Sequence, residues 1–239
     1  MSEPFLTRFL QPLLGGRRAE CFELMSHAID EGMPADALLC DVVWPAMSQV
    51  QRLYDDDRIN VAVEHMASRI VRAVANQLQP HLRSKPACGR RVLVTSADTT
   101  SDELGGQILA DLFQAEGWEV FFLGGGVPDD EVLASVGQLR PHVLLIYGAL
   151  PEAVANTRAM IERIRDVGVC PDMNVVLSGG IFNRADGLWV ELGADAFAPT
   201  PREVLTLATQ LGPRTPRGPS LGIVKKRRRK RRAQAVGTA

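Results

Sequence analysis

Apolar residues recur at helical spacing through residues 1–80 of this chain and fall into short, β-rich runs beyond residue 90. The last helical segment, from about residue 58 to residue 78, repeats them at steps of three and four: Ile59, Val63, Met66, Ile70 and Val74. That spacing is typical of an amphipathic helix with one face in a core. Glycines and a proline separate the earlier helical segments, and Pro80 ends the last one. We therefore expect residues 1–80 to form a four-helix bundle that acts as a cap.

Beyond a polar linker at residues 81–90, short β-rich runs alternate with helical patterns. The five expected strands are Val92–Ser96, Glu119–Leu123, Val143–Tyr147, Val175–Ser178 and Ala194–Ala198. Helices are expected to begin near Glu103, Asp129, Glu152, Asn183 and Pro201. Five such units predict an α/β domain over residues 91–212, with a flavodoxin-like, doubly wound, five-stranded parallel sheet. A ligand site is expected at the carboxyl ends of its strands.

Charge divides the chain near residue 213. Ten of the 27 Lys and Arg residues fall within residues 213–239, which hold no Asp or Glu, so residues 1–212 carry the other 17 against 28 acidic residues. The body is therefore near −11 and the tail near +10. Eight of the cations are consecutive: Lys225, Lys226, Arg227, Arg228, Arg229, Lys230, Arg231 and Arg232. We expect this polybasic tail to be disordered and to bind nucleic acid. Folding back onto the acidic body, or binding anionic lipid, are the alternatives.

Composition places the protein among cytoplasmic proteins without a membrane span. Hydrophobic residues make up 46% of the chain, enough for a sizeable core. The longest apolar run, residues 143–150, is too short to cross a bilayer. The four cysteines lie far apart, as expected of reduced thiols. No nucleophile elbow, Ser-His-Asp order or metalloprotease helix motif is visible, so we expect a protein that is not an enzyme.

Glycines gather at the expected carboxyl ends of the strands. Gly105 lies in the loop after the first strand, and Gly124 lies 19 residues beyond it, after the second. Gly179 and Gly180 follow Ser178 at the end of the fourth strand. Such glycines are common in tight turns between a strand and a helix. Because they have no side chain, they also let a bulky, flat ligand approach the backbone, and their joint placement favours a tetrapyrrole-type site.

This arrangement resembles the cobalamin-binding domain family. In that family an Asp-x-His-x-x-Gly loop follows the first strand, and Leu-Gly, Ser-x-Leu and Gly-Gly follow the second, third and fourth strands. The resemblance places these glycines and the Ser-x-Leu on the following residues: Gly105, Gly124, Gly148, Leu150, Gly179 and Gly180. It spans about residues 5–211 and implies that cobalamin is the cofactor.

The helical region strengthens the resemblance. Residues 54–65 look like the Trp-x(9)-Glu-His element of light-sensing cobalamin regulators of the CarH and AerR type. In those proteins a helix bundle caps the upper face of the corrin, and the histidine can ligate cobalt. Glu64 and His65 match the element, and the aromatic residue is Tyr54. On a helix, His65 lies about 100° from the apolar stripe, so it can face a second domain. The alternative is a surface histidine beside a glutamate.

The lower cobalt ligand departs from the family pattern. The resemblance places the family's ligating histidine on Asp102 and its aspartate on Thr100. A carboxylate suits harder ions and binds cobalt more weakly than an imidazole does. We therefore expect His65 to be the metal ligand, with further anchoring from burial of the corrin. Haem in place of cobalamin, as in sensors of related fold, and the absence of any cofactor are the alternatives.

These features favour a regulatory or sensory protein that binds cobalamin or a related tetrapyrrole. Ligand state or light would shift how the cap and the sheet pack. That shift would alter contacts with a partner transcription regulator, such as a DNA-binding repressor, or with nucleic acid through the tail. One alternative is a corrinoid methyl carrier of a methyltransferase system, although the absent lower histidine argues against it. Another is a ligand-free interaction module of the same fold. A homo-oligomer is a further candidate assembly.

Removing residues 213–239 should leave the fold and cofactor binding intact, because this segment lacks the apolar residues to join a core. The same truncation should abolish most nucleic-acid association, since the acidic body repels a polyanion. A mobility-shift titration of full-length and truncated protein at two salt concentrations tests this. The affinity of the full-length protein should fall by orders of magnitude from low to physiological salt. Equal binding by both proteins, or no binding even at low salt, would refute the prediction.

Overall fold

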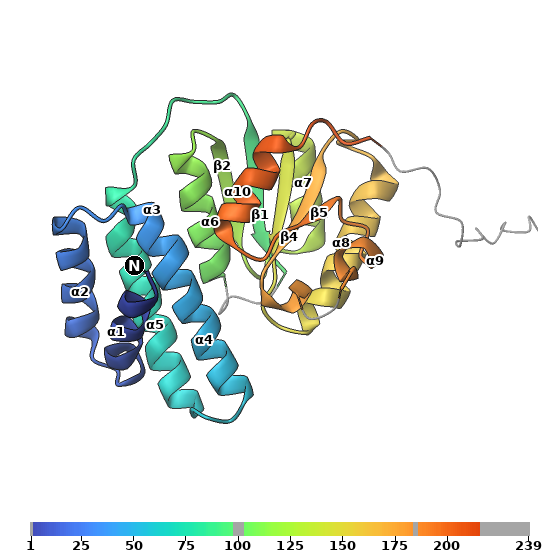
Figure 1. The fold of residues 1–239 in the computed structure, drawn as a ribbon. Coiled ribbons are helices and arrows are strands. Elements are labelled where there is room, and N and C mark those ends of the chain that lie inside the picture. The colour runs from blue at the N-terminus through green and yellow to red at the C-terminus, as the bar shows by residue number, and fades with distance from the viewer. Residues whose placement is uncertain (1, 98–102, 184–185, 216–239) are drawn as a thin grey trace, which may run out of the picture.

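The computed structural model describes residues 2–97, 103–183 and 186–215 and shows a helical cap beside an α/β domain (Figure 1). Residues 82–90 connect the two parts. Asp102 and the basic run Lys225–Arg232 lie outside the described residues, so the predictions that rest on them stay predictions. Within the described ranges, no helix is both long enough and apolar enough to cross a membrane.

The cap consists of α1 (Ser2–Leu14), α2 (Arg18–Asp30), α3 (Ala35–Leu38), η1 (Leu39–Val43), α4 (Trp44–Asp55) and α5 (Val61–Leu78). The segments α3, η1 and α4 follow one another without a break, and η1 is a π-helical turn directly before Pro45. Proline cannot donate an N–H and crowds the preceding turn, and a π turn accommodates both effects. Asn60 starts α5 by accepting a hydrogen bond from the Val63 N–H at 3.0 Å. The cap is therefore a bundle of four helices, as predicted.

The α/β domain contains one sheet and its flanking helices. The strands are β1 (Arg91–Ser96), β2 (Glu119–Gly124), β3 (Val143–Tyr147), β4 (Asn174–Ser178) and β5 (Ala196–Phe197). The short helix η2 (Gln79–His81) ends the cap. The helices of the α/β domain are α6 (Leu104–Ala115), α7 (Asp129–Leu139), α8 (Glu152–Val167), η3 (Gly180–Asn183), α9 (Leu188–Glu191) and α10 (Pro201–Gln210). All paired strands are parallel, in the order β2-β1-β3-β4-β5. This is the flavodoxin-like order, so the predicted fold class is confirmed.

Alternate residues of the sheet enter two separate cores. Val94 and Leu145 pack on the face that α6 and α10 cover, and this core continues into the cap. Leu93 and Leu144 point to the other face, where they pack with residues of α7, α8 and α9. Figure 1 shows α6 and α10 on the side of the sheet toward the cap. One face of the sheet is therefore covered by two layers, first α6 and α10 and then the cap.

The linker is bonded to the α/β domain along its second half. The backbone N–H of Lys85 donates to the Ala115 carbonyl at 2.7 Å, and that of Cys88 donates to the Gly117 carbonyl at 2.9 Å. A Cβ on Gly117 would lie 2.1 Å from the carbonyl oxygen of Pro86, and its φ is +84°. Only glycine fits this close approach. The linker thus follows the turn between α6 and β2.

The region after β4 contains less regular structure than expected. In place of one helix from near Asn183, the chain forms η3 and then, after Gly187, the single turn of α9. The strand expected at Ala194–Ala198 covers only Ala196 and Phe197. The backbone still bonds to β4 on either side of these two residues, because the Asp195 N–H donates to the Val175 carbonyl at 2.9 Å and the Ala198 N–H donates to the Leu177 carbonyl at 3.2 Å.

Asp195 is the centre of a charged cluster that is largely shielded from solvent. Its Oδ2 accepts hydrogen bonds from the Arg165 guanidinium and from the Val175 N–H, and its Oδ1 accepts one from Arg214 Nε at 2.9 Å. The Asp195 side chain is only 11% exposed. Arg214 is therefore held by the domain, although the tail was expected to begin at residue 213. That boundary lies too early, and a truncation that tests the tail should begin after residue 215.

Replacing Asp195 with alanine would leave Arg165 and Arg214 largely buried without their shared partner. We expect Asp195→Ala to lower the free energy of unfolding by about 3–5 kcal/mol. Urea denaturation followed by circular dichroism measures the loss. Asp130→Ala is the matched control, because Asp130 pairs with Arg163 at an exposed site and should cost less than about 1 kcal/mol. Equal losses for the two variants would contradict the role given to Asp195.

Candidate functional site

The glycines at the carboxyl edge of the sheet are packed mostly against the protein itself. A Cβ on Gly124 would lie 2.5 Å from Glu103 Oε2, and one on Gly179 would lie 2.0 Å from the Gly148 carbonyl oxygen. Both residues have positive φ, +75° at Gly124 and +114° at Gly179. The backbone conformation therefore favours glycine at both positions, and at Gly179 the close backbone approach demands it. Gly180 differs, because a Cβ there would meet nothing within 4 Å.

Ser178 presents an unsatisfied polar group at the same edge. Its side chain is fully buried, and its Oγ has no hydrogen-bond partner among the described residues. Buried hydroxyls are almost always bonded, so this oxygen is available to a polar group of a ligand. Leu150, in the turn after β3, is half-buried. The orphaned hydroxyl beside the open Gly180 backbone fits a large cofactor with polar groups on its rim.

Two aromatic rings close the inner part of the interface between cap and sheet. Trp44 of α4 meets Tyr147, the last residue of β3, edge to face, with 5.9 Å between ring centroids. Both side chains are nearly buried. A Cβ on Gly105 would lie 2.2 Å from the Tyr147 ring, so the predicted loop glycine makes room for that ring.

The predicted cap residues lie at the exposed end of the bundle, where α4 ends and α5 begins. Tyr54 is 39% exposed. The His65 side chain is 65% exposed, and its Nε2 lies 3.6 Å from Glu64 Oε2. Glu64 is more buried and accepts a hydrogen bond from Ser68 Oγ at 2.6 Å. His65 thus points away from the bundle core, with a carboxylate beside it.

The face of α5 that carries His65 turns toward the α/β domain. Two turns farther along this face, Arg72 Nη1 donates to Gln107 Oε1 of α6 at 3.4 Å, and Asn76 Oδ1 accepts from Gln107 Nε2 at 2.7 Å. His65 precedes Arg72 by seven residues, or about 10 Å along the helix. In Figure 1 this end of the cap extends past the start of α6. His65 therefore lies on the same side of α5 as the residues that contact α6, while Asp102 is outside the described residues.

Sequence reasoning missed several residues of this edge. Glu103 was expected only to begin a helix, and Arg72, Trp44 and Tyr147 were not considered as site residues. Their contacts join positions far apart in sequence and leave no periodic signal. The nearest available signal was the polar face of α5, on which Arg72 and His65 share one side.

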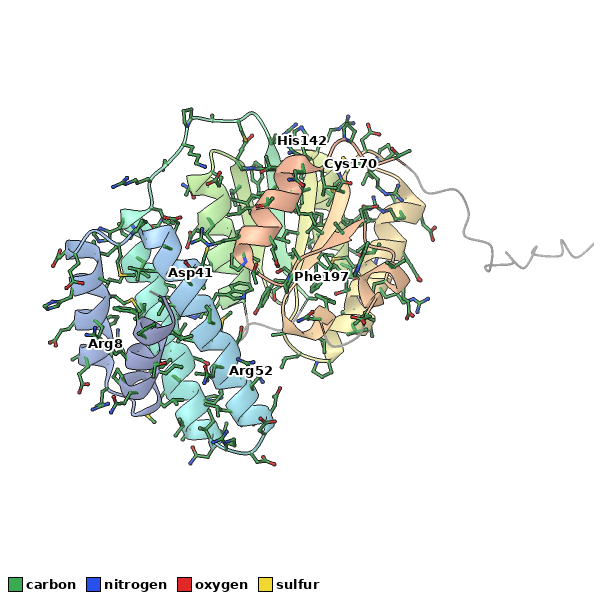
Figure 2. The ribbon with its side chains drawn as sticks, viewed as in Figure 1. Arg8, Asp41, Arg52, His142, Cys170 and Phe197 are labelled. Atoms are coloured by element: carbon green, nitrogen blue, oxygen red, sulfur yellow. The ribbon has the colours of Figure 1, made fainter. Side chains whose placement is uncertain are left out.

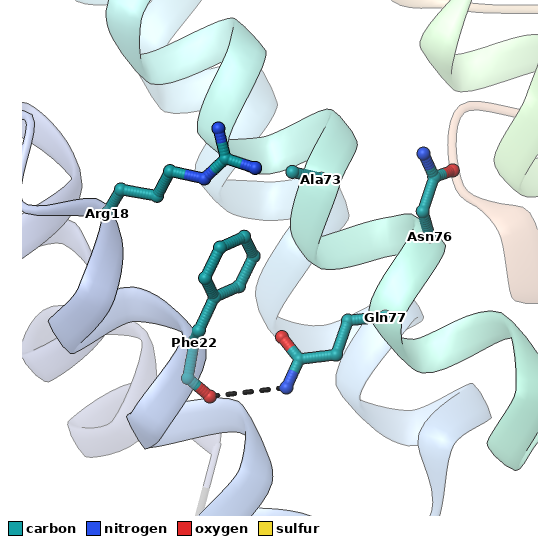
Figure 3. A pocket seen from close by; sticks show the side chains of 5 residues that line it. All are labelled: Arg18, Phe22, Ala73, Asn76 and Gln77. Atoms are coloured by element: carbon teal, nitrogen blue, oxygen red, sulfur yellow. Dashed lines mark hydrogen bonds between the residues drawn. The ribbon is translucent and has the colours of Figure 1, made fainter.

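The two grooves found elsewhere on the described surface do not coincide with this edge. One is a shallow groove between α2 and α5, in which Arg18 stacks over the Phe22 ring and Gln77 Nε2 donates to the Phe22 carbonyl (Figure 3). The other lies between the cap, the linker, α6 and α10. It is close to Asp41, which pairs with Arg202 of α10 across the domain boundary (Figure 2). No cluster of three or more metal-binding side chains occurs among the described residues.

Curated relatives of this chain include corrinoid proteins and one repressor. Dimethylamine corrinoid protein 2 of Methanosarcina mazei is 21% identical over 168 residues, which cover 69% of this chain and 77% of the relative. The methanol–corrinoid protein of Methanosarcina barkeri is 27% identical over 187 residues, covering 76% and 72%. The HTH-type transcriptional repressor CarA of Myxococcus xanthus is 28% identical over 122 residues, covering 51% of this chain and 41% of the repressor.

Among solved structures, the monomethylamine corrinoid protein of Methanosarcina barkeri shares the fold, with a TM-score of 0.77 over 87% of this chain and 98% of that one, at 16% identity. Two protein families, each described as a B12 binding domain, match residues 6–79 and residues 90–206. The first match covers the cap and the second covers the sheet and its helices. The helical cap and the α/β domain thus each match a B12-binding family, and cobalamin, the cofactor predicted from the sequence, is confirmed.

Proposed function

We propose that this protein is a corrinoid carrier, which holds cobalamin between the cap and the carboxyl edge of the sheet and presents it to separate methyl-transferring proteins. The observation that carries the proposal is the match to the dimethylamine and methanol corrinoid proteins, which spans both domains. The repressor match, by contrast, covers about half of the chain. The comparisons thus favour the carrier over the regulator that the sequence motifs favour.

Bound cobalamin would supply a cobalt centre that accepts and releases a methyl group. The residues of the chain would hold and shield that group. Ser178 offers an unpaired hydroxyl at the sheet edge, and Gly180 leaves its backbone open to a ligand. From the cap, the half-exposed Tyr54 and the exposed His65 would face the cofactor and limit the access of water.

A carrier with this sequence would have to hold cobalamin without the lower histidine ligand of the family pattern. The resemblance places the family's ligating histidine on Asp102, and a carboxylate is the weaker ligand for cobalt. Retention of cobalamin would therefore depend on burial at the sheet edge and on contacts from the cap.

The same departure favours a second candidate, a regulator that holds cobalamin through His65. The element formed by Tyr54, Glu64 and His65 is similar to that of light-sensing regulators, and part of the chain is similar to a transcriptional repressor. A regulator of this kind would act through a DNA-binding partner or through nucleic acid bound at the basic tail. Under it, the state of the cofactor would alter how the protein contacts its partner.

The carrier proposal is tested by loading the full chain with hydroxocobalamin, reducing it with titanium(III) citrate and adding iodomethane. We expect the visible spectrum of the protein fraction to report reduction and then methylation, with iodide as the leaving group and the corrinoid retained on gel filtration after each step. Free cobalamin in the same buffer is the reference for the spectra. Loss of colour on reduction, or resistance of the bound cofactor to reduction, would rule out the carrier. No retained colour with any cobalamin would reject the cofactor site as well.

The regulator candidate is tested at the histidine. His65→Ala should shift the visible spectrum of the bound cobalamin and weaken its retention on gel filtration, because it removes the axial imidazole. Asp102→Ala should change both much less. His81→Ala, an exposed histidine at the other end of the cap, is the matched control and should behave like the unmodified protein. A larger effect from Asp102→Ala than from His65→Ala would place the protein ligand on the opposite face.

A further inference from the structure

The carboxylate of Glu103 contacts two different parts of the molecule at the carboxyl edge of the sheet, where cobalamin is proposed to bind. Glu103 immediately precedes α6. Its Oε2 accepts a hydrogen bond from the backbone N–H of Gly125 at 3.1 Å, in the turn after β2. Its Oε1 lies 3.7 Å from Arg72 Nη1 of the cap. Glu103 therefore connects the start of α6, the glycine turn and the cap.

The turn is built around this carboxylate. Gly124, with φ +75°, approaches Glu103 so closely that a Cβ would lie 2.5 Å from Oε2. The carboxylate could move away from such a Cβ, but it would then lose its bond to Gly125. The resemblance to the cobalamin-binding family predicts that Gly124 contacts the cofactor. In the structure, Gly124 is also the residue that admits Glu103.

On the cap side, the contact continues through a chain of polar groups. Arg72 also donates to Gln107, and Gln107 in turn donates to Asn76. These bonds join the second half of α5 to α6, two to three turns along the helix from His65. A second ion pair between cap and α/β domain, Asp41 with Arg202, joins η1 to α10.

We propose that Glu103 is a positioning residue for cobalamin: its carboxylate holds the Gly124–Gly125 turn at the sheet edge and, through Arg72, holds the cap in register with that edge. The inference rests on the placement of cobalamin between cap and sheet given above. Both side chains are about one third exposed, 30% for Glu103 and 34% for Arg72. Loss of this ion pair is therefore expected to shift the cap relative to the turn more than it lowers the free energy of unfolding.

Three variants separate the two contacts. Glu103→Gln keeps an oxygen for the Gly125 N–H and removes the charge that faces Arg72. Arg72→Gln removes the same ion pair from the other side. Glu103→Ala removes both contacts. We expect Glu103→Gln and Arg72→Gln each to raise the Kd for hydroxocobalamin about two- to fivefold, and the double variant to do no more than either single variant. Glu103→Ala should raise it about tenfold or more, because a charged hydrogen bond to the turn is also lost.

Asp41→Asn is the matched control, because it breaks the interdomain ion pair between η1 and α10. Its Kd should stay within about twofold of that of the unmodified protein. Thermal unfolding without cobalamin should be similar for Glu103→Gln and Asp41→Asn, which separates positioning from general stability. Equal Kd values for Glu103→Ala and the unmodified protein, or equal effects of Asp41→Asn and Arg72→Gln, would overturn the proposal.

A second measurement requires no cofactor. Amide hydrogen exchange at Gly125 should be faster in Glu103→Ala than in the unmodified protein, and Glu103→Gln should restore the slower rate. Unchanged exchange in Glu103→Ala would overturn the proposal even if cobalamin binds. Conversely, the expected exchange pattern in a protein that fails to retain cobalamin would support the contact between Glu103 and the turn, while rejecting the carrier function and the role in placing cobalamin.

Discussion

A single apolar core runs from the cap through α6 and α10 into one face of the sheet, and it determines where the two domains meet. Phe9 and Leu78 of the cap belong to the same cluster as Val94 and Leu145 of the sheet. Each fully buried side chain of this size contributes about 1.5–3 kcal/mol, whereas an exposed ion pair contributes at most about 1 kcal/mol. The core therefore sets the position of the cap, and pairs such as Arg72 with Glu103 contribute much less to holding it there.

The glycines of the sheet edge show how one residue can satisfy the fold and a ligand together. Gly124 admits the Glu103 carboxylate, Gly179 admits the Gly148 carbonyl, and Gly105 admits the Tyr147 ring. Each would be needed without any cofactor. Substitutions there would disturb the turns before they report on a ligand. Ser178, whose buried hydroxyl has no partner among the described residues, and the exposed His65 are therefore the more informative positions.

The sequence predicts much of the fold because buried parallel strands give continuous apolar runs. The first four strands lie within one residue of their expected bounds. β5 covers only Ala196 and Phe197, although the neighbouring Asp195 and Ala198 still donate backbone hydrogen bonds to β4. Met66 was expected in the buried stripe of its helix, yet it is 45% exposed and lies over Gly16 at the margin of the cap. Helical periodicity placed His65 outside the bundle correctly. The contact of Glu103 with Arg72 could not be predicted, because it joins two helices through side chains 31 residues apart.

The attachment of the linker to the turn between α6 and β2 shortens the tether between the domains. Only Leu82, Arg83 and Ser84 separate the end of η2 from Lys85, the first linker residue that bonds to α6. Three extended residues span about 10 Å. Any separation of the cap from the sheet is limited to a short excursion, during which the two surfaces stay at a high effective concentration for one another. A partner protein that needed the carboxyl edge of the sheet would therefore have to compete with a cap that stays tethered beside it.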